Sequence, residues 1–225
     1  MNWLMRGLSS SVGKKFIVGS MGLLLCVFLV VHLAGNLLLY GGPGAYDAYA
    51  EALHEQEWLV KLAEAGLVVL FGLHIAVSLW TTKQNWGARP DDYALRRAKV
   101  ENRTIPLAPS YWMLGSGLVV LVFLIVHLGD FTLGLWHQPP EENVLPFDKA
   151  VHVMNQPVSF WLYIVGSLLL GVHLAHGFGS AFRSLGVRHP KYTPLIWWFG
   201  VIFAVAMGLG FLSFPIWAKF YAASL

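Results

Sequence analysis

The chain has 225 residues, of which 56% are hydrophobic and only 12% are charged, with a formal net charge of +3. Soluble domains carry about 25% charged residues, so the composition argues against a soluble enzyme. The same figures exclude a disordered chain, which requires low hydrophobicity and high charge. The single cysteine, Cys26, excludes a disulfide framework and a cysteine-based zinc or iron–sulphur site.

Five stretches of the chain are long and apolar enough to cross about 30 Å of hydrocarbon as helices. They cover residues 16–40, 58–82, 110–136, 157–182 and 194–218, to within a few residues. Backbone groups in lipid must bond to one another, so runs of this length predict helices. We therefore expect an all-α integral membrane bundle of five transmembrane helices, forming one domain over residues 1–225. The outer segments 41–57 and 137–156 are expected to include short interfacial helices.

The basic residues are unequally distributed between the loops. Three lie before the first span, six in the loop after the second and three in the loop after the fourth, which leaves only three of the 15 for the other side. Short loops rich in Lys and Arg stay in the cytoplasm. This pattern predicts a cytoplasmic N-terminus and a C-terminus outside.

Each of the first four spans contains a histidine late in its run: His32, His74, His127 and His173. Any one of them fits a neutral histidine that hydrogen-bonds to a neighbouring helix, because polar groups in a membrane usually face the bundle interior. Their depths, however, match in pairs. At 1.5 Å per residue, two of them lie about 25 Å from the cytoplasmic edge and two lie about 14–15 Å from it. The first pair is His32 and His127, and the second is His74 and His173.

Two imidazoles that face each other across a bundle can bind a haem iron from both sides. His32 and His127 would hold one b haem nearer the outside, and His74 and His173 a second one nearer the cytoplasm, with the layers roughly 10 Å apart. The chain has no Cys-x-x-Cys-His motif, so the haems would not be covalently attached. A non-haem metal site fits less well, because such sites usually need three or four ligands at one level.

Around these histidines the sequence resembles the five-helix dihaem cytochrome b membrane-anchor subunit of succinate dehydrogenases and fumarate reductases. The matching stretches are VHLAGNL (31–37), GLHIAVSLW (72–80), NWGARP (85–90), VHLGDF (126–131) and GVHLAHGFGSAFRSLG (171–186). The resemblance covers nearly the whole chain, including the number of spans and the order of the histidines. It implies that the four histidines above are the axial ligands of two b haems.

The resemblance also implies a function and partners. In that family the anchor binds a flavoprotein subunit and an iron–sulphur subunit on the cytoplasmic face, and electrons pass between iron–sulphur clusters, haems and a membrane quinone. This places the chain in the respiratory chain and tricarboxylic acid cycle, as a multi-pass protein of the bacterial inner membrane. Menaquinone is the quinone of many two-haem members, and no nucleic acid partner is implied. Some family members carry a glutamate in a proton path two residues before the fourth ligand, where this chain has Gly171.

Several polar residues near the cytoplasmic ends of the spans are candidates for contacts with the inner haem. Ser20, Trp112 and Arg183 could meet its propionates, since arginine pairs well with carboxylates. His176 follows His173 by one helical turn, and it could contact a propionate, line a quinone pocket or simply pack.

Quinone chemistry moves protons as well as electrons, so a quinone site needs polar groups at a water-accessible edge. Glu64 and Asp130 lie closest to the outer ends of their spans and are the candidate proton groups. Glu51 and His54 fit better as solvated interface residues.

Two other classes of protein remain open at this point. One is the haem b anchor of another membrane oxidoreductase, of the hydrogenase or formate dehydrogenase type, but those commonly place two ligands on one helix. The other is a haem-free transporter, which usually shows broken helices at the midplane and inverted repeats. Neither feature is evident, although Pro215 could kink the fifth span.

Overall fold

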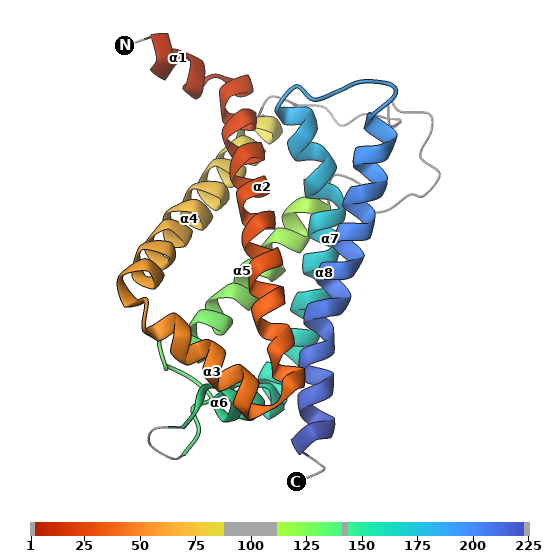
Figure 1. The fold of residues 1–225 in the computed structure, drawn as a ribbon. Coiled ribbons are helices and arrows are strands. Elements are labelled where there is room, and N and C mark those ends of the chain that lie inside the picture. The colour runs from red at the N-terminus through yellow and green to blue at the C-terminus, as the bar shows by residue number, and fades with distance from the viewer. Residues whose placement is uncertain (1–2, 88–111, 141–143, 223–225) are drawn as a thin grey trace.

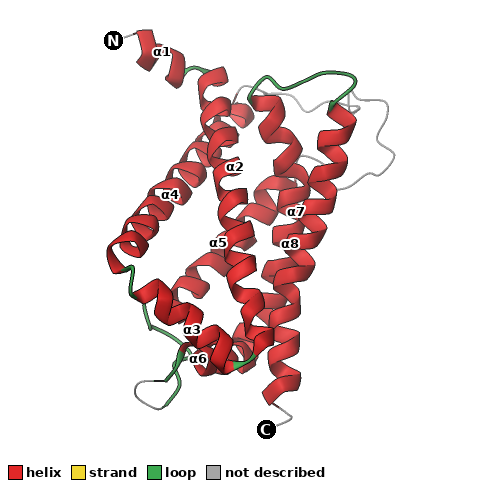
Figure 2. Cartoon of the chain, in the orientation of Figure 1, coloured by secondary structure: helices red, strands yellow, loops and turns green. Residues whose placement is uncertain are grey.

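The computed structural model describes residues 3–87, 112–140 and 144–222, and their regular secondary structure is entirely helical (Figure 2). Five of these helices are long and apolar enough to span a membrane. They are α2 (Ser11–Asn36), which the short 3-10 helix η1 (Leu37–Gly41) extends, α4 (Glu57–Gly87), α5 (Trp112–Phe131), α7 (Pro157–Ser184) and α8 (Thr193–Ala222). This confirms the prediction of an all-α fold with five candidate transmembrane helices.

Three shorter helices lie at the ends of the bundle: α1 (Trp3–Ser9), α3 (Pro43–His54) and α6 (Pro146–Asn155). The N-terminus lies at one end of the bundle, with α1, and the C-terminus at the other, with α3 and α6 (Figure 1). We call these ends the N-side and the C-side. Which of them faces the cytoplasm stays a prediction from the basic loops, and the largest of those loops, residues 88–111, lies outside the described residues.

The third span is shorter than the sequence predicts. Helix α5 ends at Phe131 rather than at residue 136, because the chain folds back on the helix end. The backbone N–H groups of Leu133 and Leu135 donate to the carbonyls of Leu128 and Gly129, each at 2.8 Å. Gly134 has φ +60°, which favours glycine. The Trp136 ring then lies against Gly129, where a side chain would collide with it.

The spans pack as two antiparallel pairs, α2 with α4 and α5 with α7, and α8 lies along α7. The α7–α8 contact is close because Gly171 faces Gly208: a Cβ atom at Gly171 would lie 3.4 Å from the Gly208 Cα atom. On the N-side, Lys14 joins α2 to α4. Its Nζ atom donates to Gln84 Oε1 at 2.6 Å and lies 4.9 Å from the centre of the Trp80 ring.

Helix α4 has no buried residue along its whole length. Several of its large apolar side chains that do not line the cavity described below are well over one-third exposed, among them Leu62 and Val69. Exposed apolar surface of this extent is typical of a helix that faces lipid on its outer side. The described part of the chain buries no side chain on the inner side of α4 either.

The two short C-side helices are tied to each other and to the bundle. Asp47 in α3 accepts a hydrogen bond from the backbone N–H of Phe147 at 2.8 Å, which satisfies a donor in the first turn of α6. Asn155 at the end of α6 donates to the carbonyl of Ala218 in α8 at 3.0 Å. Phe147 itself is 1% exposed. Short helices are thus present in both segments, as the sequence predicts, and their position at a membrane interface stays a prediction.

The helix pairs repeat one another in sequence as well as in space. GLLLCVFLVVHL in α2 (22–33) and GLVVLVFLIVHL in α5 (117–128) are identical at eight of twelve positions. A shorter match, Gly-x-His-x-Ala, begins at Gly72 in α4 and at Gly171 in α7. Helices α3 and α6 connect their pairs in the same order. The bundle therefore consists of two similar halves, α2–α4 and α5–α7, which run in the same direction, with α8 added to the second.

Candidate cofactor-binding cavity

A cavity of about 650 Å³ lies between the two helix pairs. All four span histidines line it, and most of the remaining lining is aliphatic or aromatic. It extends along α2 from Lys15 to Asn36, which is about 32 Å at 1.5 Å per residue. Its volume falls within the range of about 300–1,000 Å³ that is usual for ligand and cofactor sites.

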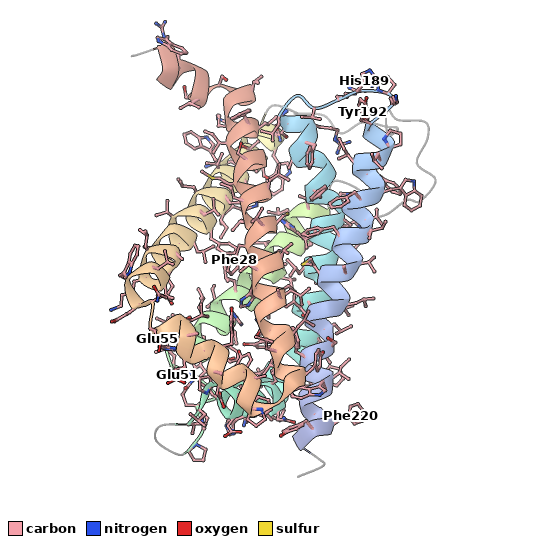
Figure 3. All side chains as sticks on the ribbon, in the orientation of Figure 1. Phe28, Glu51, Glu55, His189, Tyr192 and Phe220 are labelled. Carbon is pink, nitrogen blue, oxygen red and sulfur yellow. The ribbon has the colours of Figure 1, made fainter. Side chains whose placement is uncertain are left out.

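The structure brings His32 and His127 together in a C-side layer of the cavity. Their ring centres are 5.8 Å apart and their planes nearly perpendicular, at 84°. Phe28 stacks on the first ring and Phe123 on the second, one helical turn before each histidine. Phe28 is visible midway along α2 in Figure 3. Since a metal–imidazole bond is only about 2.0–2.1 Å long, rings this close can reach a shared ion.

His74 and His173 form an N-side layer, and each faces a glycine of the helix with which its own helix is paired. A Cβ atom at Gly22 in α2 would lie 3.5 Å from His74 Cε1, and one at Gly117 in α5 would lie 3.3 Å from His173 Cε1. These two glycines occupy the same position of the sequence repeat. They leave room for the rings, so they are more than general helix-packing residues.

The repeat fixes the distance between the two layers. Gly22 precedes His32 by ten residues, and Gly117 precedes His127 by ten. The layers are therefore about 15 Å apart along both helices. This is larger than the spacing of roughly 10 Å expected from the sequence, where the membrane edge was taken from the first charged or polar residue of each span.

Hydrogen bonds orient the ring of one histidine in each layer. His127 Nδ1 lies 3.3 Å from the Tyr163 hydroxyl, which donates to Asp130. His173 Nδ1 lies 3.2 Å from the Ser116 hydroxyl, which donates to the Met113 carbonyl. Because both hydroxyl protons are used elsewhere, these networks assign the proton of each imidazole to Nδ1. Nε2 of each ring then keeps a lone pair with which to bind a metal.

The other two histidines are less firmly held. His74 Nδ1 is buried and has no hydrogen-bond partner among the described residues. A buried polar atom without a partner is rare in proteins, so the His74 ring is less constrained than the rings of His127 and His173. Asn36 Nδ2 lies 3.5 Å from both ring nitrogens of His32 and donates to the His32 carbonyl at 2.7 Å.

Among the described residues no cluster of three or more His, Cys, Asp or Glu side chains could hold a bare metal ion. Within the described ranges, each layer offers two histidines and no carboxylate. An ion bound there would need its remaining ligands from a larger group. The donor set thus fits a flat metal macrocycle held from both faces, and it does not fit a zinc or non-haem iron centre.

The polar residues at the N-side mouth of the cavity differ from those expected. Ser20, Trp112, His176 and Arg183 do not line the cavity. Arg183 is exposed, and its guanidinium donates at 2.8 Å to Ser180 Oγ, which does line the cavity. The polar lining residues are instead Lys15, Ser78, Thr81, Thr82, Ser180 and Ser184. Helical phase, which an end-of-span argument ignores, decides which side chains point inward.

The two candidate proton groups lie in contrasting surroundings. Glu64 is exposed on α4, near the C-side end of the helix, and does not line the cavity. Asp130 is 0% exposed and also lies outside the lining, so it is not at the water-accessible edge that the sequence argument assumed. Glu51 and His54 are exposed on α3, as expected; Figure 3 shows Glu51 at the C-side end of the molecule.

Sequence reasoning missed the residues that surround the histidines, above all Tyr163, Ser116 and His137. The repeat would have found part of the arrangement, because aligning α2 with α5 places Gly22 beside Gly117 and His32 beside His127. The hydrogen-bonding residues depart from the repeat, so they had no such signal.

A scan against protein-family models, a search of curated proteins and a search of solved structures each found no match to this chain.

Proposed function

We propose that this chain is the membrane-anchor and electron-transfer subunit of a succinate:quinone or quinol:fumarate oxidoreductase and that it binds two b haems. One observation carries the proposal: four helices each contribute one histidine to a single apolar cavity, in two layers about 15 Å apart. The sequence resemblance to the dihaem anchors names the enzyme class. His32 and His127 would be the axial ligands on the C-side, and His74 and His173 on the N-side.

The packing of α4 supports a large apolar cofactor. This helix buries no residue, yet Leu67, Phe71 and His74 on its inner side line the cavity. A haem between the helix pairs would cover this face and complete the contact between α4 and the second half. Lys15 and the three serines at the N-side mouth, Ser78, Ser180 and Ser184, could meet propionates, since ammonium and hydroxyl groups both donate to carboxylates. The Thr81 and Thr82 hydroxyls instead donate to the Val77 and Ser78 carbonyls of their own helix.

When bound, each b haem would accept and release one electron. The chain would hold the two groups at fixed depths, orient Nε2 of His127 and His173 through their Nδ1 partners, and exclude water with its apolar lining. Two such groups, one above the other, would carry electrons between the two sides of the membrane.

The family resemblance, and not the cavity, is the ground for the partners. A flavoprotein subunit and an iron–sulphur subunit would bind on the N-side, which the basic loops assign to the cytoplasm. A membrane quinone, with menaquinone as the family expectation, would react near the C-side layer. Glu64 is the better placed proton group for it, because this carboxylate is exposed and Asp130 is enclosed.

The purified chain and its associated proteins provide the test. We expect a dithionite-reduced b-type spectrum with two haems per chain, and a flavoprotein and an iron–sulphur protein in the same preparation. A colourless preparation would contradict the cofactor assignment. Two haems with hydrogenase or formate dehydrogenase subunits would keep the cofactors and replace the enzyme class.

A further inference from the structure

A buried carboxylate lies at the C-side end of α5, outside the cavity. Asp130 is 0% exposed, and three side chains, those of His137, Ser159 and Tyr163, lie within hydrogen-bond distance of its carboxylate oxygens. His137 Nδ1 lies 2.9 Å from Oδ1, and Ser159 Oγ donates to Oδ2 at 3.2 Å. The fold-back after α5 places His137 there, with φ +46°, and Gln138 Nε2 fixes this turn by donating to the Asp130 carbonyl at 2.8 Å.

This network reaches the proposed ligand His127. Tyr163 Oη donates to Asp130 Oδ2 at 3.4 Å and lies 3.3 Å from His127 Nδ1. The hydrogen bonds therefore run in one direction, from the Nδ1–H group of His127 to the tyrosine oxygen and from the tyrosine hydroxyl to the carboxylate. Both distances are longer than an ordinary hydrogen bond of about 2.7–3.0 Å, so the carboxylate acts on the ring through a weak contact.

The first half of the bundle has the same histidine without this network. By the repeat, the counterpart of Asp130 is Gly35, and the Tyr49 hydroxyl packs against it so closely that a Cβ atom there would lie 2.5 Å away. Counting back ten residues from His173 reaches Tyr163, whereas the same count from His74 reaches Glu64, which is exposed. The first half of the bundle thus packs its helices without a buried acid at this position. The packing of the helices is therefore not a sufficient reason for Asp130 in the second half.

We propose that Asp130, acting through Tyr163, is a positioning residue that fixes the His127 ring and lowers the reduction potential of the metal centre bound by His127. This inference rests on the proposed haem function. A carboxylate that pulls on the Nδ1 proton makes the imidazole a stronger electron donor, which stabilises the oxidised metal. The carboxyl group is fully buried, so Tyr163 donates to Asp130 and not to bulk water, and His137 and Ser159 hold the acceptor in place.

Among the described residues, no carboxyl group is hydrogen-bonded to a histidine partner in the N-side layer. There His173 Nδ1 meets the neutral Ser116 hydroxyl, the His173 ring also lies against the Met113 backbone, and His74 Nδ1 has no partner among the described residues. The structure therefore predicts that the two centres differ in potential partly because their ligands differ in these second contacts. It also predicts that each centre can be shifted by itself.

The test is a potentiometric titration of the haem spectrum in the purified complex. The C-side component is the one that disappears in His127→Ala. In Tyr163→Phe we expect its ratio of reduced to oxidised haem to rise about tenfold at a fixed potential, an upward shift of about 59 mV for one electron. Asp130→Asn should shift it in the same direction, whereas Asp130→Glu, which keeps the charge, should stay closer to the unmodified protein.

Two variants serve as controls. Ser159→Ala removes a donor to Asp130 but leaves the path through Tyr163, so it should keep the C-side component within a small fraction of that shift. Ser116→Ala should move only the N-side component.

Different results would contradict the proposed haem function and the inferred role of Asp130. Absence of haem in the unmodified protein would overturn the proposed function. Two haems with an unchanged C-side potential in Tyr163→Phe and Asp130→Asn would overturn the inference alone. Loss of the C-side haem in Tyr163→Phe, rather than a shifted potential, would also overturn it, because the tyrosine would then be needed only for assembly.

Discussion

The half of the bundle formed by α2, α3 and α4 and the half formed by α5, α6 and α7 place histidines at equivalent positions, yet they surround them differently. The second half orients both of its histidines with side-chain hydroxyls, from Ser116 and Tyr163. In the first half, His74 Nδ1 has no partner among the described residues. If haems bind as proposed, equivalent ligands in unequal surroundings would give two centres with matched geometry and separately adjustable electronic properties.

The halves differ in their neighbours as well. Helix α8 lies along α7, whereas no described segment covers the equivalent helix α4 in this way, and α4 buries no residue. The repeat thus produces the histidine layers, and the added helix supports only one half. This comparison leads to four predictions beyond the potential measurements above.

The largest effect is expected from replacing the histidines. If each layer takes one histidine from each half, His32→Ala and His127→Ala should remove the same haem, and His74→Ala and His173→Ala the other. Haem content should fall from two to one per chain in each variant, because a b haem held by non-covalent contacts depends on its axial ligands. Pyridine haemochrome assay and the reduced spectrum measure this. Loss of one spectral component by both His74→Ala and His127→Ala would show that the pairing crosses the layers.

The repeated glycines give the next effect, on one layer only. In Gly117→Val a side chain would enter the space of the His173 ring, since even a Cβ atom would lie 3.3 Å from Cε1. We expect a loss of most of the N-side haem with the C-side haem retained, measured by the same assay. Gly115→Val is the control on the same helix, because nothing lies within 4 Å of a Cβ atom there. Equal haem loss in both variants would mean that valine harms α5 generally.

Five apolar runs predicted the five spans because length and hydrophobicity alone decide whether a helix crosses a membrane. The end of α5 could not be predicted, since it depends on a backbone turn at Gly134 and on the Trp136 ring packing back over Gly129. That same turn encloses Asp130, which the sequence argument placed at a water-accessible edge. Residue spacing along the spans was enough to pair His32 with His127. It did not show which way each side chain points around its helix, so the residues at the N-side mouth of the cavity could not be predicted.

The third prediction concerns α8 and the equivalent residues Gly72 and Gly171. A side chain at Gly171 would press on the Ala204 carbonyl and the Gly208 Cα atom, at 3.2 and 3.4 Å from a Cβ atom, whereas nothing lies within 4 Å at Gly72. Gly171→Leu should therefore destabilise the protein by about 1–3 kcal/mol, the usual cost of overpacking. Gly72→Leu should cost much less. Thermal unfolding in detergent compares the two, and equal destabilisation would show that α8 does not distinguish the halves. The close contact of α7 with α8 also explains why a glutamate side chain, which some members of the resembled family carry at this position, does not fit at Gly171.

The smallest effect tests the link between the two halves at the C-side. The Asp47 carboxylate in α3 accepts from the backbone N–H of Phe147 at 2.8 Å, so one half caps the first turn of α6 in the other. Asp47→Ala removes this bond and the favourable charge at the N-terminus of α6, at a cost of about 1 kcal/mol. Asp47→Asn keeps an acceptor oxygen and should recover part of that loss. The free energy of unfolding in detergent measures both, and the haem spectrum should stay unchanged, because Asp47 does not line the cavity. A spectral change in Asp47→Ala would mean that the hydrogen bond between Asp47 and Phe147 helps to hold the histidine layers in position. The two halves would then depend on their connecting helices, α3 and α6.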